Sequence, residues 1–211
     1  MAPPALASTP QTPIRAVIFD LDGTLTAPLL DIAAIRRELG VPPGHPILEA
    51  LEHFELPRRV MAEEILRRRE MEAIEAATLA AGCREVLAFL ESRGLPVAIL
   101  TRNIRAAVEH FTSRFGFRFA ATFTREDGPA KPAPDGVTAL CRSLGVAPSE
   151  TLVVGDYKFD ILAGRDAGCR TALVRPGELG GQVPLAVAQS AEWGPPNHVV
   201  DSLHGLIPLL R

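Results

Sequence analysis

Four short apolar segments, each ending in a polar residue, constrain the fold of this 211-residue chain more than any other feature. They are residues 15–20, 95–101, 151–156 and 170–175. Their apolar residues are continuous and do not alternate with polar ones, which is typical of strands buried on both faces of a parallel sheet. Helical patterns follow most of these segments, so the chain is expected to alternate between strands and helices.

The remaining segments extend this alternation. Residues 117–124 predict a further strand, and residues 198–200 predict a last short strand before a closing helix. An amphipathic helix is expected over residues 103–115 with Asn103 as its N-cap, and another over residues 135–144 that stops at Gly145. Together these elements predict an α/β fold with a doubly wound (Rossmann-like) parallel sheet as its core.

One stretch interrupts the pattern. From residue 28 to residue 81 no strand is indicated, and helical patterns are split near residues 40–44 and 56–57. This predicts an α-helical cap domain over residues 28–82, inserted into an α/β core made of residues 14–27 and 83–211. Residues 1–13 are rich in Pro, Ala and Thr and carry no charged side chain, so we expect a disordered tail there.

Charge and composition exclude several classes of partner. The net charge of −3 gives no attraction to nucleic acid or to an anionic membrane, and no apolar run is long enough to span a bilayer. Residues 1–13 lack the basic start and apolar core of a secretory signal. The three cysteines, Cys83, Cys141 and Cys169, are widely spaced and fit no metal-binding pattern. We therefore expect a cytoplasmic protein with reduced thiols, either a monomer or a homodimer.

The polar residues that end the apolar segments suggest a site. Ligands of parallel sheets collect outside the carboxyl ends of the strands, so these side chains are expected to converge. The set contains four carboxylates, one hydroxyl and one ammonium group: Asp20, Asp22, Asp156, Asp160, Thr101 and Lys131. Hard oxygen ligands of this kind bind Mg²⁺, which in turn bridges to phosphate oxygens.

These residues occur in four ordered motifs that resemble those of the haloacid dehalogenase-like (HAD) superfamily. The first is DLDGT at residues 20–24, and the second is Thr101 after an apolar strand. The third is Lys131 in KPAPD at residues 131–135, and the fourth is GDYKFD at residues 155–160. The chain is most similar to the phosphoglycolate phosphatase-like branch, whose members insert a helical cap just after the first motif.

The resemblance implies a role for each acidic residue. Asp20 would be the nucleophile that forms an aspartyl-phosphate. Asp22 would protonate the leaving oxygen and then deprotonate the attacking water. Mg²⁺ would bind Asp20, the backbone carbonyl of Asp22, and Asp156, with Asp160 supporting these ligands.

The resemblance also assigns the phosphate contacts. Thr101 and the backbone N–H of Arg102 would bind phosphoryl oxygens, and Lys131 would neutralise charge on the transferring group. The implied activity is Mg²⁺-dependent hydrolysis of a small soluble phosphomonoester. The substrate would be a small phosphorylated metabolite, and the sequence does not specify which one.

The motif residues disfavour two other activities of this superfamily and leave two alternatives open. Asp22 argues against dehalogenation, which needs no proton donor for a halide, and residues 26–82 lack the lysine that a phosphonatase requires. A phosphomutase shares all four motifs, so it stays open as an alternative. A non-catalytic scaffold or regulatory protein on this fold is the second alternative, although such a protein would normally have lost one of the motif residues.

Overall fold

A computed structural model describes residues 12–175 and 194–211 of the chain. The predicted tail at residues 1–13 lies almost entirely outside the described residues, as do residues 176–193. None of the helices in the described ranges is long and apolar enough to cross a membrane.

The centre of the protein is a six-stranded sheet in which every pair of neighbours is parallel. Its strand order is β3-β2-β1-β4-β5-β6, so the chain winds outward from β1 in both directions. The strands are β1 (Ala16–Phe19), β2 (Val97–Leu100), β3 (Ala121–Phe123), β4 (Thr151–Gly155), β5 (Arg170–Val174) and β6 (His198–Val200). This arrangement confirms the predicted doubly wound α/β fold.

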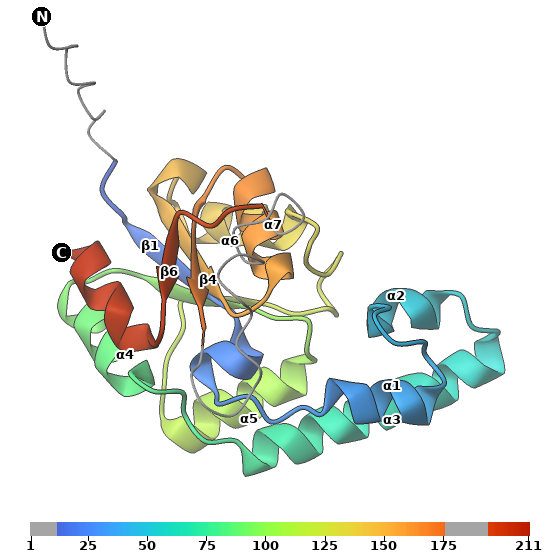
Figure 1. Ribbon diagram of the computed structural model, residues 1–211. Coiled ribbons are helices and arrows are strands. Elements are labelled where there is room, and N and C mark those ends of the chain that lie inside the picture. Colours follow the sequence, from blue (N-terminus) through green and yellow to red (C-terminus); the bar gives the residue numbers. More distant parts are fainter. Residues whose placement is uncertain (1–11, 176–193) are drawn as a thin grey trace, which may run out of the picture.

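Helices cover both faces of the sheet (Figure 1). Successive side chains of a strand point to opposite faces, and in β1 Ile18 joins one core cluster while Val17 and Phe19 join the other. The Ile18 side is covered by α6 (Asp135–Leu144) and α7 (Lys158–Asp166), and the Phe19 side by α4 (Cys83–Ser92), α5 (Arg105–Phe115) and the 3-10 helix η3 (Leu203–Leu210).

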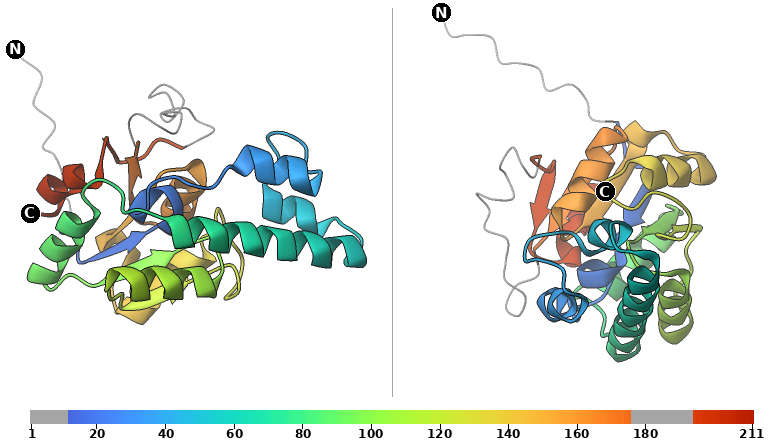
Figure 2. Two further views of the ribbon diagram at one scale, coloured as in Figure 1. Left: turned by 90° about the horizontal axis from the view of Figure 1, so that it is seen from below. Right: turned by 90° about the vertical axis from the view of Figure 1, so that its right-hand side faces the viewer.

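The helical insertion, which we define as residues 28–82, contains α1 (Ile32–Leu39), α2 (Ile47–Glu52) and α3 (Leu56–Ala76). Gly40 ends α1 with a left-handed backbone (φ 69°), and Pro57 lies in the first turn of α3, where its missing N–H costs nothing. The two chain segments that lead into and out of the insertion pair through an antiparallel bridge between Thr26 and Leu79. Figure 2 shows α1, α2 and most of α3 projecting to one side of the sheet.

Two separate core clusters share helix α3. Its first half contributes Ala62 and Leu66 to a small apolar cluster with α1 and α2, whereas Ile74 near its end belongs to the main core. Helix α3 also packs along α5. The long helix therefore belongs to the insertion at one end and to the body of the protein at the other.

The structure corrects one detail of the sequence prediction. The helix expected to begin after Asn103 begins at Arg105, and its N-cap residue is Ile104, which has no side-chain cap. Asn103 is 2% exposed, and its side-chain oxygen accepts a hydrogen bond from the N–H of Ile104 (2.7 Å). The nitrogen of the Asn103 side-chain amide remains available for a contact outside the helix.

Phe111 tests how much the core on this side contributes to stability. Its ring is fully buried and lies 5.3 Å from the ring centre of Phe115 and 5.8 Å from that of Phe117. We expect Phe111→Ala to lower the free energy of unfolding by about 3–5 kcal/mol, because the truncation leaves a cavity. Urea denaturation measures this change, with Met61→Ala, at a side chain that is 67% exposed, as the control. A loss below about 1 kcal/mol would contradict the expectation.

Candidate active site

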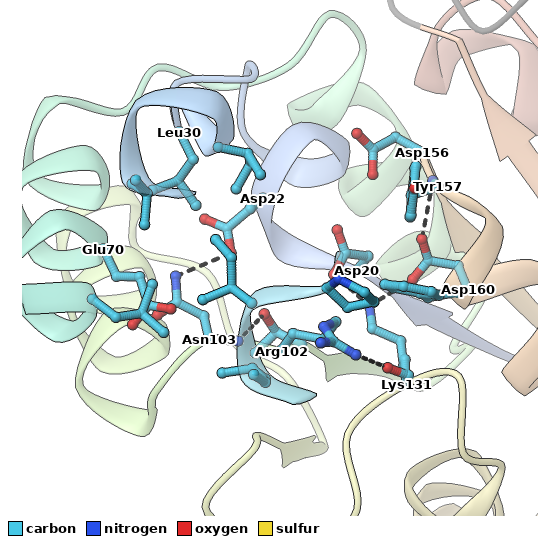
Figure 3. Close-up of a pocket in the computed structure, with 18 of the residues that line it drawn as sticks. Asp20, Asp22, Leu30, Glu70, Arg102, Asn103, Lys131, Asp156, Tyr157 and Asp160 are labelled. Carbon is cyan, nitrogen blue, oxygen red and sulfur yellow. Dashed lines mark hydrogen bonds and ion pairs between the residues drawn. The ribbon is translucent and has the colours of Figure 1, made fainter. Parts of the chain in front are cut away.

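A pocket of about 620 Å³ lies between the carboxyl ends of the strands and the helical insertion. All of the site residues predicted from the sequence contribute to its wall (Figure 3). They are Asp20, Asp22, Thr101, Arg102, Lys131, Asp156 and Asp160. The topology explains their convergence, because β1, β2 and β4 are neighbours in the sheet and end at the same edge.

The ammonium group of Lys131 is the most enclosed cation of the pocket. Its Nζ lies 2.5 Å from Asp20 Oδ1 and 2.5 Å from Asp160 Oδ1, and it also donates to the carbonyl of Leu100 (2.8 Å). The Lys131 side chain is 3% exposed. Burial acts to lower its pKa, but the two carboxylates outweigh burial and raise the pKa above its ordinary value. Lys131 is therefore charged at any physiological pH.

Three carboxylates form an acidic cluster next to this ammonium group. Oxygen atoms of Asp20, Asp156 and Asp160 lie within 4.8 Å of one another. Burial raises the pKa of Asp20 to about 7, and burial together with the charges of Asp20 and Asp160 raises the pKa of Asp156 well above its ordinary value. One ammonium group does not offset three carboxylates at this spacing, so the cluster fits a divalent cation.

Two glycines let the backbone approach these carboxylates closely. Gly23 has a φ of 86°, and a Cβ atom at this position would lie 2.3 Å from Asp156 Oδ2. A Cβ atom at Gly155 would lie 2.0 Å from Asp160 Cγ. Any larger residue at either position would displace a carboxylate of the cluster.

Asp22 is held on the other side of Asp20 by the loop after β2. Its Oδ2 accepts a hydrogen bond from Asn103 Nδ2 (3.0 Å), and Thr101 Oγ1 accepts one from the Asn103 N–H (3.0 Å). Burial raises the pKa of Asp22, and the hydrogen bond from Asn103 reduces this shift. Asp22 is thus positioned as a carboxyl group that holds a proton more readily than an exposed aspartate.

The Arg102 side chain points toward the helical insertion. Its guanidinium forms a two-pronged ion pair with Glu49 of α2 (2.9 and 2.7 Å), lies 4.7 Å from the ring centre of Phe159, and donates to the carbonyl of Lys131. Partial burial acts to raise the pKa of Glu49, but the hydrogen bonds to Arg102 and the charge of Arg102 together outweigh burial and lower the pKa. The sequence analysis assigned a role only to the backbone N–H of Arg102. The side chain of Arg102 in addition links the insertion to the core.

Three pocket contacts were not predicted from the sequence. Asn103 was interpreted as a helix cap but contacts Asp22. Glu49 pairs with Arg102, and Glu70 of α3 pairs with Arg125 in the loop after β3. The TRN sequence after β2 could have indicated Asn103, since a polar residue three positions past a strand end can also reach the site. No comparable signal marks the two glutamates.

The fold and the site define an α/β enzyme whose acidic centre lies at the carboxyl edge of a parallel sheet, beneath a helical insertion. Comparisons with known proteins identify the family. The haloacid dehalogenase-like hydrolase model matches residues 14–168. The chain therefore belongs to the haloacid dehalogenase-like hydrolases, which confirms the resemblance of the four motifs.

Individual relatives agree with this assignment. A haloacid dehalogenase-like hydrolase domain-containing protein of Arabidopsis thaliana is 34% identical over 80% of this chain and 74% of its own length. A phosphoglycolate phosphatase of Chromobacterium violaceum is 28% identical over 76% of this chain and 85% of its own length. The crystal structure of a hydrolase from Pseudomonas syringae superposes with a TM-score of 0.76 at 20% identity, covering 93% of this chain and 97% of that one, and supports the fold.

The raised pKa of Asp156 predicts a stabilising substitution. Ionised Asp156 opposes folding at pH values above its raised folded-state pKa, and this opposition disappears as the pH falls toward the ordinary value of 3.8. In EDTA at pH 8, Asp156→Asn should therefore raise the free energy of unfolding by about 0.5–2 kcal/mol. The gain should shrink at pH 5.

Urea denaturation at the two pH values checks this expectation. Asp166→Asn, at an exposed position at the end of the following helix α7, is the control and should change stability by less than about 0.5 kcal/mol. A loss of stability for Asp156→Asn in EDTA at pH 8 would show that the acidic cluster is not under electrostatic strain.

Proposed function

We propose that this protein is a magnesium-dependent phosphatase that hydrolyses a small phosphomonoester through an aspartyl-phosphate on Asp20. The observation that carries the proposal is the cluster of three carboxylates at the end of β1, two of which contact the buried Lys131 ammonium. The family membership and the phosphatase named among the relatives support the same reaction class.

In the first step an oxygen of the Asp20 carboxylate attacks phosphorus, and the bond from phosphorus to the leaving oxygen breaks. Asp22 gives its proton to that leaving oxygen. The raised pKa of Asp22 suits this role, because burial favours the protonated form. The Asn103 amide holds the Asp22 carboxyl in place.

In the second step Asp22, now ionised, takes a proton from water, and the water oxygen attacks the aspartyl-phosphate. The bond from Asp20 to phosphorus breaks, which releases inorganic phosphate and restores the Asp20 carboxylate. Thr101, the backbone N–H of Arg102 and Lys131 bind phosphoryl oxygens in both steps, so that charge is stabilised at the point where it develops.

Asp20, the backbone carbonyl of Asp22, and Asp156 would bind Mg²⁺, and Asp160 would orient the site from the start of α7. The two oxygens of Asp160 already accept from Lys131 Nζ and from the N–H of Tyr157 (3.1 Å), which suits a supporting role. Bound Mg²⁺ supplies positive charge next to the transferring phosphoryl group.

We further propose that residues 28–82 act as a cap that excludes bulk water from the pocket and contacts the leaving group. Apolar residues of this segment form much of the pocket wall, and Glu49 and Glu70 tie the segment to the core. A roofed pocket of about 620 Å³ favours small phosphorylated metabolites over phosphoproteins.

Phosphate release from a panel of small phosphomonoesters tests the proposal. We expect release with Mg²⁺, none with EDTA, and a loss of at least about 10³-fold in Asp20→Asn, because this substitution removes the nucleophile. Asp201→Asn, at a side chain that is 80% exposed, is the control and should retain activity. Release that persists at the wild-type rate in Asp20→Asn would contradict the assigned nucleophile.

The covalent intermediate can be trapped in Asp22→Asn. With 4-nitrophenyl phosphate, whose leaving group needs little protonation, this variant should complete the first step but not activate water for the second. We expect a burst of nitrophenol that matches the enzyme concentration, and mass spectrometry of the acid-quenched protein should place a phosphoryl group on the peptide that contains Asp20. A burst without any adduct would argue for direct attack by water.

A further inference from the structure

Glu70 is a buried acidic residue in the pocket wall for which the proposed reaction has no use. It comes from helix α3 and is 5% exposed. Its Oε1 forms an ion pair with Arg125, whereas its Oε2 is buried without a hydrogen-bond partner among the described residues. A buried carboxylate oxygen without a donor is costly, since it has lost its hydration and gained no contact in return.

Glu70 is an acidic residue in a mainly apolar part of the pocket wall. The pocket wall that the insertion contributes is mainly apolar, with Leu30, Ile35, Ile47, Leu48 and Leu66 among its residues. Only two charged side chains of the insertion belong to this described wall, Arg36 and Glu70. Arg36 Nε already donates to the carbonyl of His45 (2.9 Å). Glu70 is therefore the acidic group that the insertion presents to a molecule in the pocket.

Glu70 is also fixed relative to the catalytic loop. Arg125, its partner, donates from its guanidinium to the carbonyl of Arg102 (3.1 Å) and from its backbone N–H to the carbonyl of Asn103 (3.3 Å). In the view of Figure 3, Glu70 lies at the opposite side of the pocket from Asp156, with Asp22 and Asn103 between them. A leaving group that extends from Asp22 toward the insertion would therefore approach Glu70.

The electrostatics are consistent with a position close to the reacting groups. Burial raises the pKa of Glu70 to about 7, the ion pair with Arg125 counteracts this shift, and the charge of Asp22 adds to it. Above pH 7 the Glu70 carboxylate in its ion pair with Arg125 is mainly ionised, and an ionised carboxylate accepts hydrogen bonds and donates none. Its natural partner in an apolar wall is a hydroxyl or amino group, and a second carboxylate on the substrate would be repelled.

We propose that Glu70 Oε2 is a specificity-determining acceptor for a hydroxyl or amino group on the leaving group, so that the preferred substrates are phosphate esters of polyols or amino alcohols. This inference rests on the proposed phosphatase function and adds the class of substrate. It disfavours esters whose leaving group is purely apolar or carries a carboxylate. Donor-bearing esters would give Glu70 Oε2 the hydrogen-bond partner that it lacks among the described residues.

Matched pairs of esters test the inference. Glycerol 1-phosphate carries hydroxyl donors on a three-carbon leaving group, propyl phosphate has the same carbon skeleton without them, and phosphoglycolate carries a carboxylate. For the wild-type enzyme we expect kcat/KM to be about 10- to 100-fold higher for glycerol 1-phosphate than for propyl phosphate, and phosphoglycolate to be no better than propyl phosphate.

Substitutions then assign this preference to Glu70. Glu70→Met removes the acceptor but keeps an unbranched side chain, and we expect the ratio between the two esters to fall to within about 3-fold. Glu70→Gln keeps one acceptor oxygen and should give an intermediate ratio, which serves as the test if Glu70→Met does not fold. Glu72→Met, at a side chain of the same helix that is 53% exposed, should leave the ratio unchanged.

The ratio of kcat/KM between glycerol 1-phosphate and propyl phosphate distinguishes substrate recognition by Glu70 from a purely structural role of this residue. If Glu70 acts only by holding Arg125, both esters should lose kcat/KM equally and the ratio should stay at its wild-type value, which would overturn the inference. A wild-type enzyme without any preference for the donor-bearing ester would overturn it as well. Absence of wild-type turnover on every ester of the panel would instead contradict the proposed phosphatase, and the inference would fall with it.

Discussion

Three carboxylates can share the carboxyl edge of this sheet because a buried ammonium group lies between two of them. Lys131 Nζ contacts both Asp20 and Asp160 at 2.5 Å and reaches the strand backbone at Leu100. This contact joins the ends of β1 and β2 with the first turn of α7, so the same ion pairs that assemble the site also connect three parts of the core. Burial is the main cause of the raised pKa values of Asp20 and Asp156, and because the positive charge covers only part of the negative charge, repulsion between the carboxylates adds to it.

The loop after β2 forms the second support of the site. Asn103 of this loop donates a hydrogen bond to Asp22, and Arg102 forms an ion pair with Glu49. The backbone carbonyls of Arg102 and Asn103 accept hydrogen bonds from Arg125. Glu49 lies on α2, and Arg125 is paired with a glutamate of α3. The loop that is proposed to bind phosphate is thus connected to two helices of the insertion, so the position of the insertion and the geometry of the loop are linked.

Sequence patterns could predict the residues whose place depends on local structure. Asp20 and Asp156 directly follow buried strands, and parallel strands end at one edge, so their meeting follows from topology alone. The pairs of Arg102 with Glu49 and of Arg125 with Glu70 could not be predicted in this way, because their members are separated by 53 and 55 residues. Whether these residues meet depends on the position of the insertion relative to the sheet, and the hydrophobic periodicity of the sequence does not determine that position. Asn103 was misinterpreted because a capping residue and a site residue look alike at a helix start.

Helix α3 belongs to two apolar clusters, and this has a consequence for how the pocket can diversify. The main core holds the last turns of the helix through Ile74, while α1 and α2 rest on its first half and contact the sheet helices little. Exchanging residues 28–55 for the corresponding segment of a relative would therefore replace most of the pocket wall that the insertion contributes, together with the Glu49–Arg102 ion pair, and would leave the acidic cluster and the anchorage of α3 in place. The residues that line the roof of the pocket can therefore vary with the substrate while the residues that hold the acidic cluster stay the same. The boundary between these two parts of the chain lies in the middle of helix α3.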